Sequence, residues 1–368
     1  MANIWYSVLG DGMGHAIRSD TVISGLIKKH SLMITATKKA YSFLKAKYGD
    51  IVHEIEGQEF VYENNTVNIM DSVKNYFHDL PFKFSSNIKQ IPELLDKFRP
   101  DLVISDFEPA AHYFANILKI PCISIDNVHV LSECEIKMPT GSRLELLRAH
   151  VLVRFLHLKS DYYILTAFAD ARPKKPEKVT IISPIVRETI RKLKPEDKKH
   201  VLIYQTTPTN SKMISLLQKN DNQFIIYGMG NKRRKKNIDF KAFSEKNFLE
   251  DLRTCKYVIL NGGFTLISEA LYLKKPILAI PIENQLEQEF NGFSLQDKGY
   301  GDYTLSLNSQ ILDKFEHLIP FFRKNLAKQK KWDPNEVFKV LDKKIPELMK
   351  KKKPKYDLLK LMSPLRRI

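Results

Sequence analysis

Short apolar runs alternate with amphipathic stretches along most of the 368-residue chain. In the first half, NIWYSVLG at 3–10, SLMITAT at 31–37 and DLVISD at 101–106 are separated by segments with helical periodicity, of which 15–30 is the clearest. The second half repeats the scheme with HVLIYQT, QFIIYGMG, KYVILNGG and KPILAIP. Apolar runs of this length separated by helices indicate β-α-β units around parallel sheets. We therefore predict an α/β fold with two tandem, doubly wound, Rossmann-like domains and a deep cleft between them.

A Pro- and Lys-rich segment separates the two halves. Residues 171–200 contain few bulky apolar side chains after Val186, so we predict an interdomain linker there. The N-terminal domain would then span 1–170 and the C-terminal domain 201–342. Helical periodicity near the end of the chain predicts two terminal helices, at 312–329 and 334–345.

The chain is strongly basic, with a formal net charge of +17. This charge favours a polyanionic partner, whether nucleic acid, an anionic membrane surface or a phosphate-bearing substrate. One basic cluster is 232–236, and the other is 343–368, where lysines alternate with Leu and Met. Lysines that alternate with Leu and Met in this way are typical of an amphipathic tail on an anionic membrane surface. Aromatic side chains that could stack on bases are scarce in the tail, so we expect no nucleic-acid partner.

No apolar run approaches the roughly 20 residues that a membrane-spanning helix requires. The first residues also lack the basic and apolar regions of a signal peptide. We expect a cytoplasmic protein, with a peripheral position on the inner face of the cell membrane as a further expectation. The three cysteines show no C-x-x-C spacing, which predicts buried thiols and no zinc site; they are Cys122, Cys134 and Cys255.

A first glycine loop follows the first predicted strand. Gly10, Gly12 and Gly14 alternate at the start of a helix, where glycines let backbone amides approach a ligand. In place of the third glycine of the dinucleotide fingerprint stands His15, and no acidic residue ends the second predicted strand. We therefore expect no nicotinamide, and indeed no cofactor at all.

His15 is a candidate catalytic base, because it lies at the rim where open α/β sheets bind their ligands. Asp106 ends another predicted strand at the same rim and could orient the imidazole. A helix cap or turn residue is the alternative interpretation of Asp106. Asp126 and His129 form a second, weaker candidate pair. For Arg18, one turn into the helix, a contact with an anionic substrate group and a simple solvated position are both open.

A second glycine loop, NGGFTLISEALYL, repeats the order of strand, glycines and helix. Amides at the helix start after Gly262 and Gly263 could hold a diphosphate without a metal, with hydroxyl groups of Thr265 and Ser268 as further donors. Glu269 suits the paired hydroxyls of a ribose. The alternative is structural, with Thr265 as the N-cap and Ser268 and Glu269 completing a capping box.

The segment PIENQLEQEFN follows the next predicted strand. We predict that Glu287 and Gln288 lie on a loop at the same rim, where a carboxylate beside a carboxamide could bind adjacent sugar hydroxyls. Asn291 is expected to anchor the helix that follows.

At these residues the chain resembles the GT-B glycosyltransferases, in particular the UDP-glycosyltransferase superfamily and the transferase that adds N-acetylglucosamine to the lipid-linked peptidoglycan precursor. The resemblance is strongest over 261–301 and implies an N-terminal acceptor-binding domain and a C-terminal nucleotide-sugar-binding domain. It also implies roles for the donor-side residues: diphosphate for Gly262, Gly263 and Thr265, ribose for Glu269, sugar for Glu287 and Gln288, and uracil for Phe243 or Ser244. His15 would be the base and Asp106 its orienting partner, with Gly12, Gly14 and Arg18 on the acceptor side.

The chain departs from this family at three places. The basic segment 232–236 stands where the family usually has a shorter loop. Glu287 stands where the family usually has Asp, so a sugar preference does not carry over. The segment QTTPTN at 205–210 lacks the glycines that many relatives have there, so the resemblance implies no phosphate contacts from that loop.

The resulting prediction is an inverting transferase for a UDP-sugar, with a lipid-linked or cell-envelope acceptor favoured by the basic tail. No D-x-D motif occurs, so we expect no catalytic metal. Three alternatives stay open: a non-hydrolysing UDP-sugar 2-epimerase, a nucleic-acid-binding protein, and a nucleotide-sugar-binding protein without catalysis. The epimerase would need several carboxylates around the sugar, and the nucleic-acid reading leaves both glycine loops unexplained.

Overall fold

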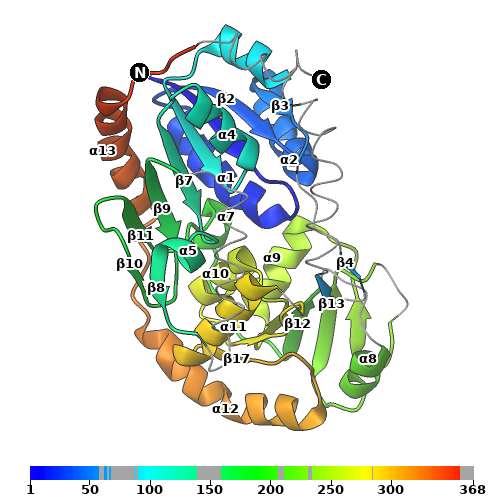
Figure 1. Ribbon diagram of the computed structural model, residues 1–368. Helices are drawn as coiled ribbons and strands as arrows, with labels where there is room; N and C mark the ends of the chain where they lie inside the picture. The colour runs from blue at the N-terminus through cyan, green and yellow to red at the C-terminus, as the bar shows by residue number, and fades with distance from the viewer. Residues whose placement is uncertain are drawn as a thin grey trace.

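The computed structural model describes residues 1–57, 62–63, 66–67, 87, 90–138, 159–205, 211–230, 234–283 and 285–356. Two α/β domains lie one above the other (Figure 1). The N-terminal domain is built on a parallel sheet in the order β11-β9-β7-β6-β1-β2-β3. Its strands are β1 (Asn3–Val8), β2 (Ser31–Ala36), β3 (Val52–Glu54), β6 (Leu102–Asp106), β7 (Cys122–Asp126), β9 (Tyr162–Thr166) and β11 (Val179–Ile182).

The C-terminal domain has a parallel sheet of its own, in the order β14-β13-β12-β15-β16-β17. Its strands are β12 (His200–Tyr204), β13 (Gln223–Tyr227), β14 (Ile238–Phe240), β15 (Val258–Leu260), β16 (Ile277–Ala279) and β17 (Gly301–Tyr303). Two small antiparallel pairs complete the strands: β4 (Tyr62–Glu63) with β5 (Thr66–Val67), and β8 (Cys134–Ile136) with β10 (Ala171–Pro173).

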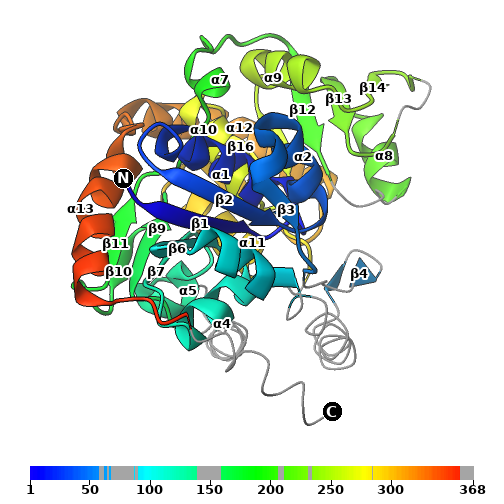
Figure 2. The same cartoon turned by 90° about the horizontal axis from the view of Figure 1, so that it is seen from above.

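Helices cover the two sheets (Figure 2). Their bounds are α1 (Met13–Leu26), α2 (Lys38–Tyr48), α4 (Pro109–Ile117), α5 (Val130–Glu133), α7 (Glu188–Arg191), α8 (Ser211–Leu217), α9 (Glu245–Thr254), α10 (Phe264–Tyr272), α11 (Leu286–Asp297), α12 (Ser309–Lys328) and α13 (Glu336–Lys351), with a 3₁₀ turn η1 (Gly49–Ile51). None of the helices within the described ranges is long and apolar enough to cross a membrane.

Each central strand is apolar on both sides because each sheet is covered on both faces. In β1, Ile4 and Tyr6 pack into one apolar cluster, whereas Trp5 between them packs into the cluster on the opposite face. Likewise Leu202 of β12 faces one cluster of the C-terminal domain, and Ile203 faces the other. These alternating contacts confirm the predicted parallel α/β architecture. The cysteines are buried free thiols, as expected.

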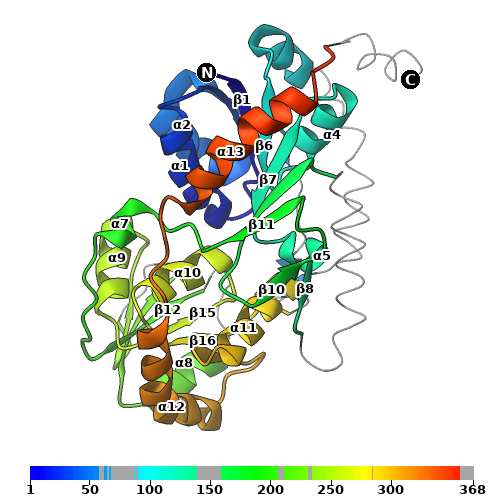
Figure 3. The same ribbon diagram turned by 90° about the vertical axis from the view of Figure 1, so that its left-hand side faces the viewer.

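The connection between the domains is shorter than the predicted linker at 171–200. β11 is the edge strand of the N-terminal sheet, pairing with β9, so this part of the segment belongs to the first domain. Val186 and Ile190 already pack into the core of the C-terminal domain. The chain therefore crosses between Ile182 and Val186 (Figure 3). Composition missed this boundary because the short edge strand lies within a segment that is otherwise rich in Pro and Lys.

The last described helix, α13, returns to the N-terminal domain and lies along it (Figure 3). Its buried side chains join that domain's apolar cluster; they are Val337, Leu341, Ile345 and Leu348. Two predictions are therefore wrong: 336–342 packs on the N-terminal rather than the C-terminal domain, and 343–351 is part of a packed helix rather than a membrane-facing tail. The remainder of the predicted tail, 357–368, lies outside the described residues.

The two domains touch across the predicted cleft. Leu286 and Phe290 of α11 pack with Val130 and Leu131 of the N-terminal domain in a shared apolar cluster. Helices α1 and α10 are also in contact. The loops that carry the two glycine motifs are thereby brought against each other.

Candidate active site

The parallel strands of the N-terminal sheet deliver their polar residues to one edge. β1, β6 and β7 end at Val8, Asp106 and Asp126, and Val8 pairs directly with Asp106. Loops that follow parallel strands emerge at the same edge of a sheet. The first glycine loop therefore lies beside the residue that ends β6.

His15 and Asp106 are in direct contact. Nδ1 of His15 lies 2.7 Å from Oδ1 of Asp106. The carboxylate is fully buried, whereas the imidazole retains 18% of its side-chain exposure. Because Nδ1 is engaged by the carboxylate, Nε2 is the ring nitrogen that can take up a proton from a substrate. This geometry is suited to a base with an orienting partner.

Asp106 is held by two further residues of α1. Arg18 donates from Nε to Oδ2 at 3.0 Å and from Nη2 to Oδ1 at 2.5 Å, and Ser19 donates to Oδ2 at 2.8 Å. Burial favours the neutral acid, but the charges of Arg18 and His15 outweigh it, so the pKa of Asp106 lies below its usual value. The solvated position considered for Arg18 is wrong, since its side chain is 2% exposed and bound to Asp106.

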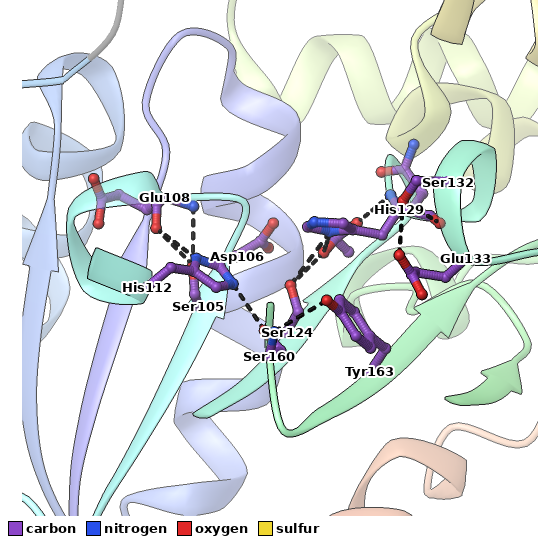
Figure 4. A network of polar contacts seen from close by, with 12 residues as sticks. Ser105, Asp106, Glu108, His112, Ser124, His129, Ser132, Glu133, Ser160 and Tyr163 are labelled. Carbon is purple, nitrogen blue, oxygen red and sulfur yellow. Dashed lines mark hydrogen bonds and ion pairs between the residues drawn. The ribbon is translucent and has the colours of Figure 1, made fainter. Parts of the chain in front are cut away.

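The second candidate pair, Asp126 and His129, is buried. His129 Nδ1 lies 2.7 Å from Asp126 Oδ2, and the His129 backbone N–H donates to Oδ1 at 2.8 Å. The side chain of His129 is 3% exposed, and that of Asp126 is 0% exposed. The pair shapes the loop after β7, and Figure 4 shows His129 within a network of polar contacts.

Phe107 lies between the two His–Asp pairs. Its ring stacks on His15 at a centroid distance of 6.3 Å and meets the His129 ring edge-on at 5.3 Å. Its φ of 53° is in the left-handed region, which bulky residues seldom adopt. Backbone strain of this kind tends to occur at functional sites.

The second glycine loop begins α10 as predicted. Gly263 is the N-cap, and no side chain caps the helix. Thr265 lies within the first turn, and its Oγ1 donates to the carbonyl of Gly14 at 3.1 Å. A Cβ at Gly14 would lie 2.9 Å from that same oxygen, so glycine permits this close approach of the domains. The structural alternative that made Thr265 the N-cap is therefore wrong. Gly12, the N-cap of α1, has space for a Cβ.

Ser268 does not present its hydroxyl group to the site. Its Oγ donates to the carbonyl of Phe264 at 2.8 Å, one turn back in the same helix, and the residue is 1% exposed. The prediction that Ser268 supplies a donor to a diphosphate is contradicted, because a hydroxyl has one proton and this one is already used.

Glu269 is paired with Arg187. Arg187 donates from Nε to Oε1 at 2.6 Å and from Nη2 to Oε2 at 3.1 Å, and from Nη1 to Glu245 at 2.5 Å. Glu269 is 3% exposed, and burial raises its pKa above the usual value although Arg187 acts in the opposite direction. Arg187 was not predicted, since one arginine in a basic segment has no distinguishing pattern.

Glu287, Gln288 and Asn291 lie on α11, so the prediction that the first two occupy a loop is wrong. The helix starts at Leu286, and carboxylates in its first turn suit the positive end of the helix dipole. Gln288 Oε1 accepts from the N–H groups of Gly262 at 3.2 Å and Ile282 at 3.0 Å. Asn291 Nδ2 donates to the carbonyl of Gly262 at 2.9 Å. These side chains hold the second glycine loop in place.

The remaining donor-side residues lie before α9. Ser244 is the N-cap of that helix, without a side-chain capping bond. Phe243 is 62% exposed and contacts the rings of Tyr227 and Phe248. Gln205 is buried, whereas 206–210 and 232–233 lie outside the described residues. In the part of the chain that the structure describes, no three His, Cys, Asp or Glu side chains form a group that could hold a metal ion.

Solved structures share this architecture, which is the two-domain GT-B fold of glycosyltransferases. The glycotransferase of kitacinnamycin has a TM-score of 0.65 at 14% identity, over 89% of this chain and 93% of that one. LpCGTa in complex with UDP has a TM-score of 0.64 at 12% identity, over 94% and 99%. UGT89C1 of Arabidopsis thaliana, complexed with UDP-L-rhamnose, has a TM-score of 0.60 at 15% identity, over 95% and 99%.

Sequence comparison identifies the family. A family model described as glycosyl transferase family 1 matches residues 2–320, and the chain belongs to this family. An uncharacterized glycosyltransferase of Methanosarcina acetivorans is 24% identical over 319 residues, which cover 80% of this chain and 83% of that relative. One of Methanopyrus kandleri is 23% identical over 244 residues, covering 61% and 69%. The predicted resemblance to GT-B glycosyltransferases is confirmed.

Proposed function

We propose that this glycosyltransferase moves a sugar from a UDP-sugar to an acceptor hydroxyl with inversion at the anomeric carbon and without a metal. The observation that carries the proposal is the contact of His15 with Asp106, 2.7 Å apart. It occurs one residue after Gly14, whose carbonyl is bonded to Thr265 at the start of α10. A base and an anion-binding helix start therefore belong to one site.

On the donor side, amides at the start of α10 would bind the diphosphate, with Gly262, Gly263 and Thr265 lining it. Glu269 would bind the ribose hydroxyls and Phe243 or Ser244 the uracil. Glu287 and Gln288 would bind the sugar, while Oε1 of Gln288 and Nδ2 of Asn291 hold the glycine loop. The UDP and UDP-L-rhamnose in the complexes of LpCGTa and UGT89C1 support a UDP-sugar as the donor class.

In the reaction, Nε2 of His15 would take the proton of the acceptor hydroxyl as its oxygen attacks the anomeric carbon. Asp106 would stabilise the resulting imidazolium, because it stays ionised in its bonds to Arg18 and Ser19. The bond from the anomeric carbon to the diphosphate breaks, and UDP leaves with the electron pair. Preorganised amides at the start of α10 would stabilise the charge that develops on the leaving group. Attack opposite to the leaving group inverts the anomeric centre.

For the acceptor, we propose a lipid-linked or cell-envelope molecule taken at the inner face of the membrane, bound on the side of Gly12, Gly14 and Arg18. The net charge of +17 and the Leu- and Met-containing sequence of 357–368 support attraction to an anionic surface. Deleting 357–368 should reduce cosedimentation with anionic vesicles at low salt, with neutral vesicles as the control. An unchanged bound fraction would argue against the membrane role.

The test of the donor is thermal unfolding with UDP, GDP, dTDP, ADP and NAD, first with EDTA and then with Mg²⁺. A ligand that binds the folded state raises the melting temperature by mass action. We expect a selective shift with UDP and one UDP-sugar in EDTA, and then UDP release when an acceptor is added. Conversion of the sugar to its epimer without acceptor would instead indicate the epimerase, and binding without any turnover would indicate a binding protein.

A further inference from the structure

The side chain of Asn127 joins the two domains inside the candidate site. Its Nδ2 donates to Oε1 of Glu287 at 2.8 Å, and its Oδ1 accepts from Nη1 of Arg18 at 2.7 Å. Asn127 is 6% exposed. A guanidinium only donates and an ionised carboxylate only accepts, so the carboxamide has one satisfactory orientation. Turning it over would place donor against donor and acceptor against acceptor.

The hydrogen bonds of Asn127 continue to the candidate base. Arg18, which is bonded to Asn127, also donates from Nε and Nη2 to the carboxylate of Asp106. That carboxylate in turn contacts Nδ1 of His15. An unbroken series of hydrogen bonds thus links Glu287 of α11 in one domain to His15 of α1 in the other. Its interior members are buried, where such bonds are stronger than in water.

The loop that carries Asn127 is fixed in shape. Asp126 accepts from the backbone N–H and contacts the ring of His129, and it also accepts from Ser124 Oγ at 2.7 Å. All three residues are buried, and Figure 4 shows Ser124 and His129 side by side in this network. The Asp126–His129 pair therefore holds Asn127 in place.

We propose that Asn127 is a positioning residue that couples recognition of the donor sugar to the alignment of the base. By holding Oε1 of Glu287, it orients the carboxylate so that Oε2 accepts a hydrogen bond from a sugar hydroxyl. The same amide fixes Arg18 and, through Asp106, the imidazole. Since the bond crosses the domain interface, it links the position of the carboxylate that binds the sugar to the position of the base. This inference rests on the proposed role of Glu287 as a sugar ligand.

Asn127→Asp and its combination with Glu287→Gln provide the test. Aspartate keeps the size of Asn127 and the bond to Arg18 but places a second carboxylate against Glu287. We expect kcat/KM for the UDP-sugar to fall about tenfold or more, which corresponds to about 1.4 kcal/mol. UDP alone should bind within about twofold of the unchanged protein, because Asn127 contacts no group assigned to the nucleotide.

The double variant Asn127→Asp, Glu287→Gln restores the bond with its direction reversed, since Gln then donates to Asp and the total charge is that of the unchanged chain. We expect kcat to recover above the product of the two single effects, with an altered preference among UDP-sugars. Effects that simply multiply would overturn the proposal. Asn127→Ala, checked for folding by its melting temperature, serves as a second single variant.

The matched control is Lys298→Ala, which removes an exposed ion pair with Asp170 that also crosses between the domains. It should leave kcat/KM within about twofold, whereas an equal loss would show that any contact between the domains matters and would overturn a specific role for Asn127. If the unchanged protein binds no UDP, the proposed function and this inference both fail. The other case is that the unchanged protein binds a UDP-sugar more tightly than UDP. If every Asn127 variant then keeps both that difference in affinity and the kcat of the unchanged protein, this inference fails while the proposed function stands.

Discussion

Thr265 Oγ1 donates a hydrogen bond to the carbonyl oxygen of Gly14, across 3.1 Å and across the boundary between the domains. The two residues are 251 positions apart in the chain. Each belongs to a glycine loop that leads from a parallel strand into a helix. The contact therefore joins two similar halves, with the proposed base His15 on one side and the start of α10 on the other.

His15→Ala should abolish most turnover while leaving UDP binding intact. Loss of a positioned base typically costs about 10²–10⁴-fold in rate. Asp106 keeps its bonds to Arg18 and Ser19 in the variant, so the melting temperature should change little. Steady-state kinetics and a UDP titration measure both effects. His317→Ala on the surface of α12 is the matched control, and full activity in His15→Ala would refute the assignment of the base.

Glu269→Gln should weaken UDP binding about tenfold, because the uncharged amide is a poorer acceptor for ribose hydroxyls. Calorimetric titration with UDP and with 2′-deoxy-UDP separates this role from a general loss of structure. The variant should weaken the binding of UDP more than that of 2′-deoxy-UDP, because the deoxy ligand lacks the 2′-hydroxyl group whose hydrogen bond is lost. Equal losses with both ligands would contradict contact with the 2′-hydroxyl.

His112 should make the protein less stable in acid. Its Nδ1 donates to the carbonyl of Glu108 at 3.0 Å, and its Nε2 lies 2.9 Å from the hydroxyl group of Ser160, contacts that a neutral ring can satisfy (Figure 4). Burial and then the neighbouring His129 lower the pKa of His112 to about 4. Between the ordinary pKa near 6.5 and that value, the unfolded chain binds the proton and the folded chain does not, so stability falls as the pH falls.

Across this interval the loss should be about 3 kcal/mol. Urea unfolding at pH 7 and pH 4.5 measures it, and His112→Asn should show a smaller difference between the two pH values. An unchanged pH dependence in the variant would mean that other groups cause the acid sensitivity. Comparison with His317→Ala, at an exposed position, controls for simple loss of a histidine.

Leu341→Ala on α13 should destabilise the N-terminal domain by about 2–5 kcal/mol, because it leaves a cavity in a packed core. Lys343→Ala on the exposed side of the same helix should change stability by less than about 0.5 kcal/mol. Thermal or urea unfolding distinguishes the two. Equal and small effects would mean that α13 contributes little to that core.

The sequence predicted the features that depend on local pattern. Apolar runs located the central strands, and the glycines located both loops, because a strand and a tight turn are encoded within a few residues. Pairing of His15 with Asp106 was also predictable, since parallel strands deliver their ends to one edge. The role of Arg18 in holding Asp106 was not, because an arginine on a helix looks the same whether it faces solvent or a buried carboxylate.

Residues whose roles depend on distant partners were missed for the same reason. Arg187 and Asn127 bind Glu269 and Glu287, which lie 82 and 160 positions further along the chain. Ser268 was assigned to a ligand because its use by the Phe264 carbonyl cannot be seen in its type or spacing. The burial of α13 was hidden by its many lysines, although its apolar residues recur at helical intervals.

The return of α13 to the first domain has a consequence for biosynthesis. Domains generally fold in order as the ribosome releases them, the first before the second. Here the core that contains Ile4 and Tyr6 also contains Leu341 and Ile345, which are translated after the entire second domain. The first domain to emerge is thus the last to complete its core. Until α13 is released from the ribosome, the apolar surface that α13 covers stays exposed to water.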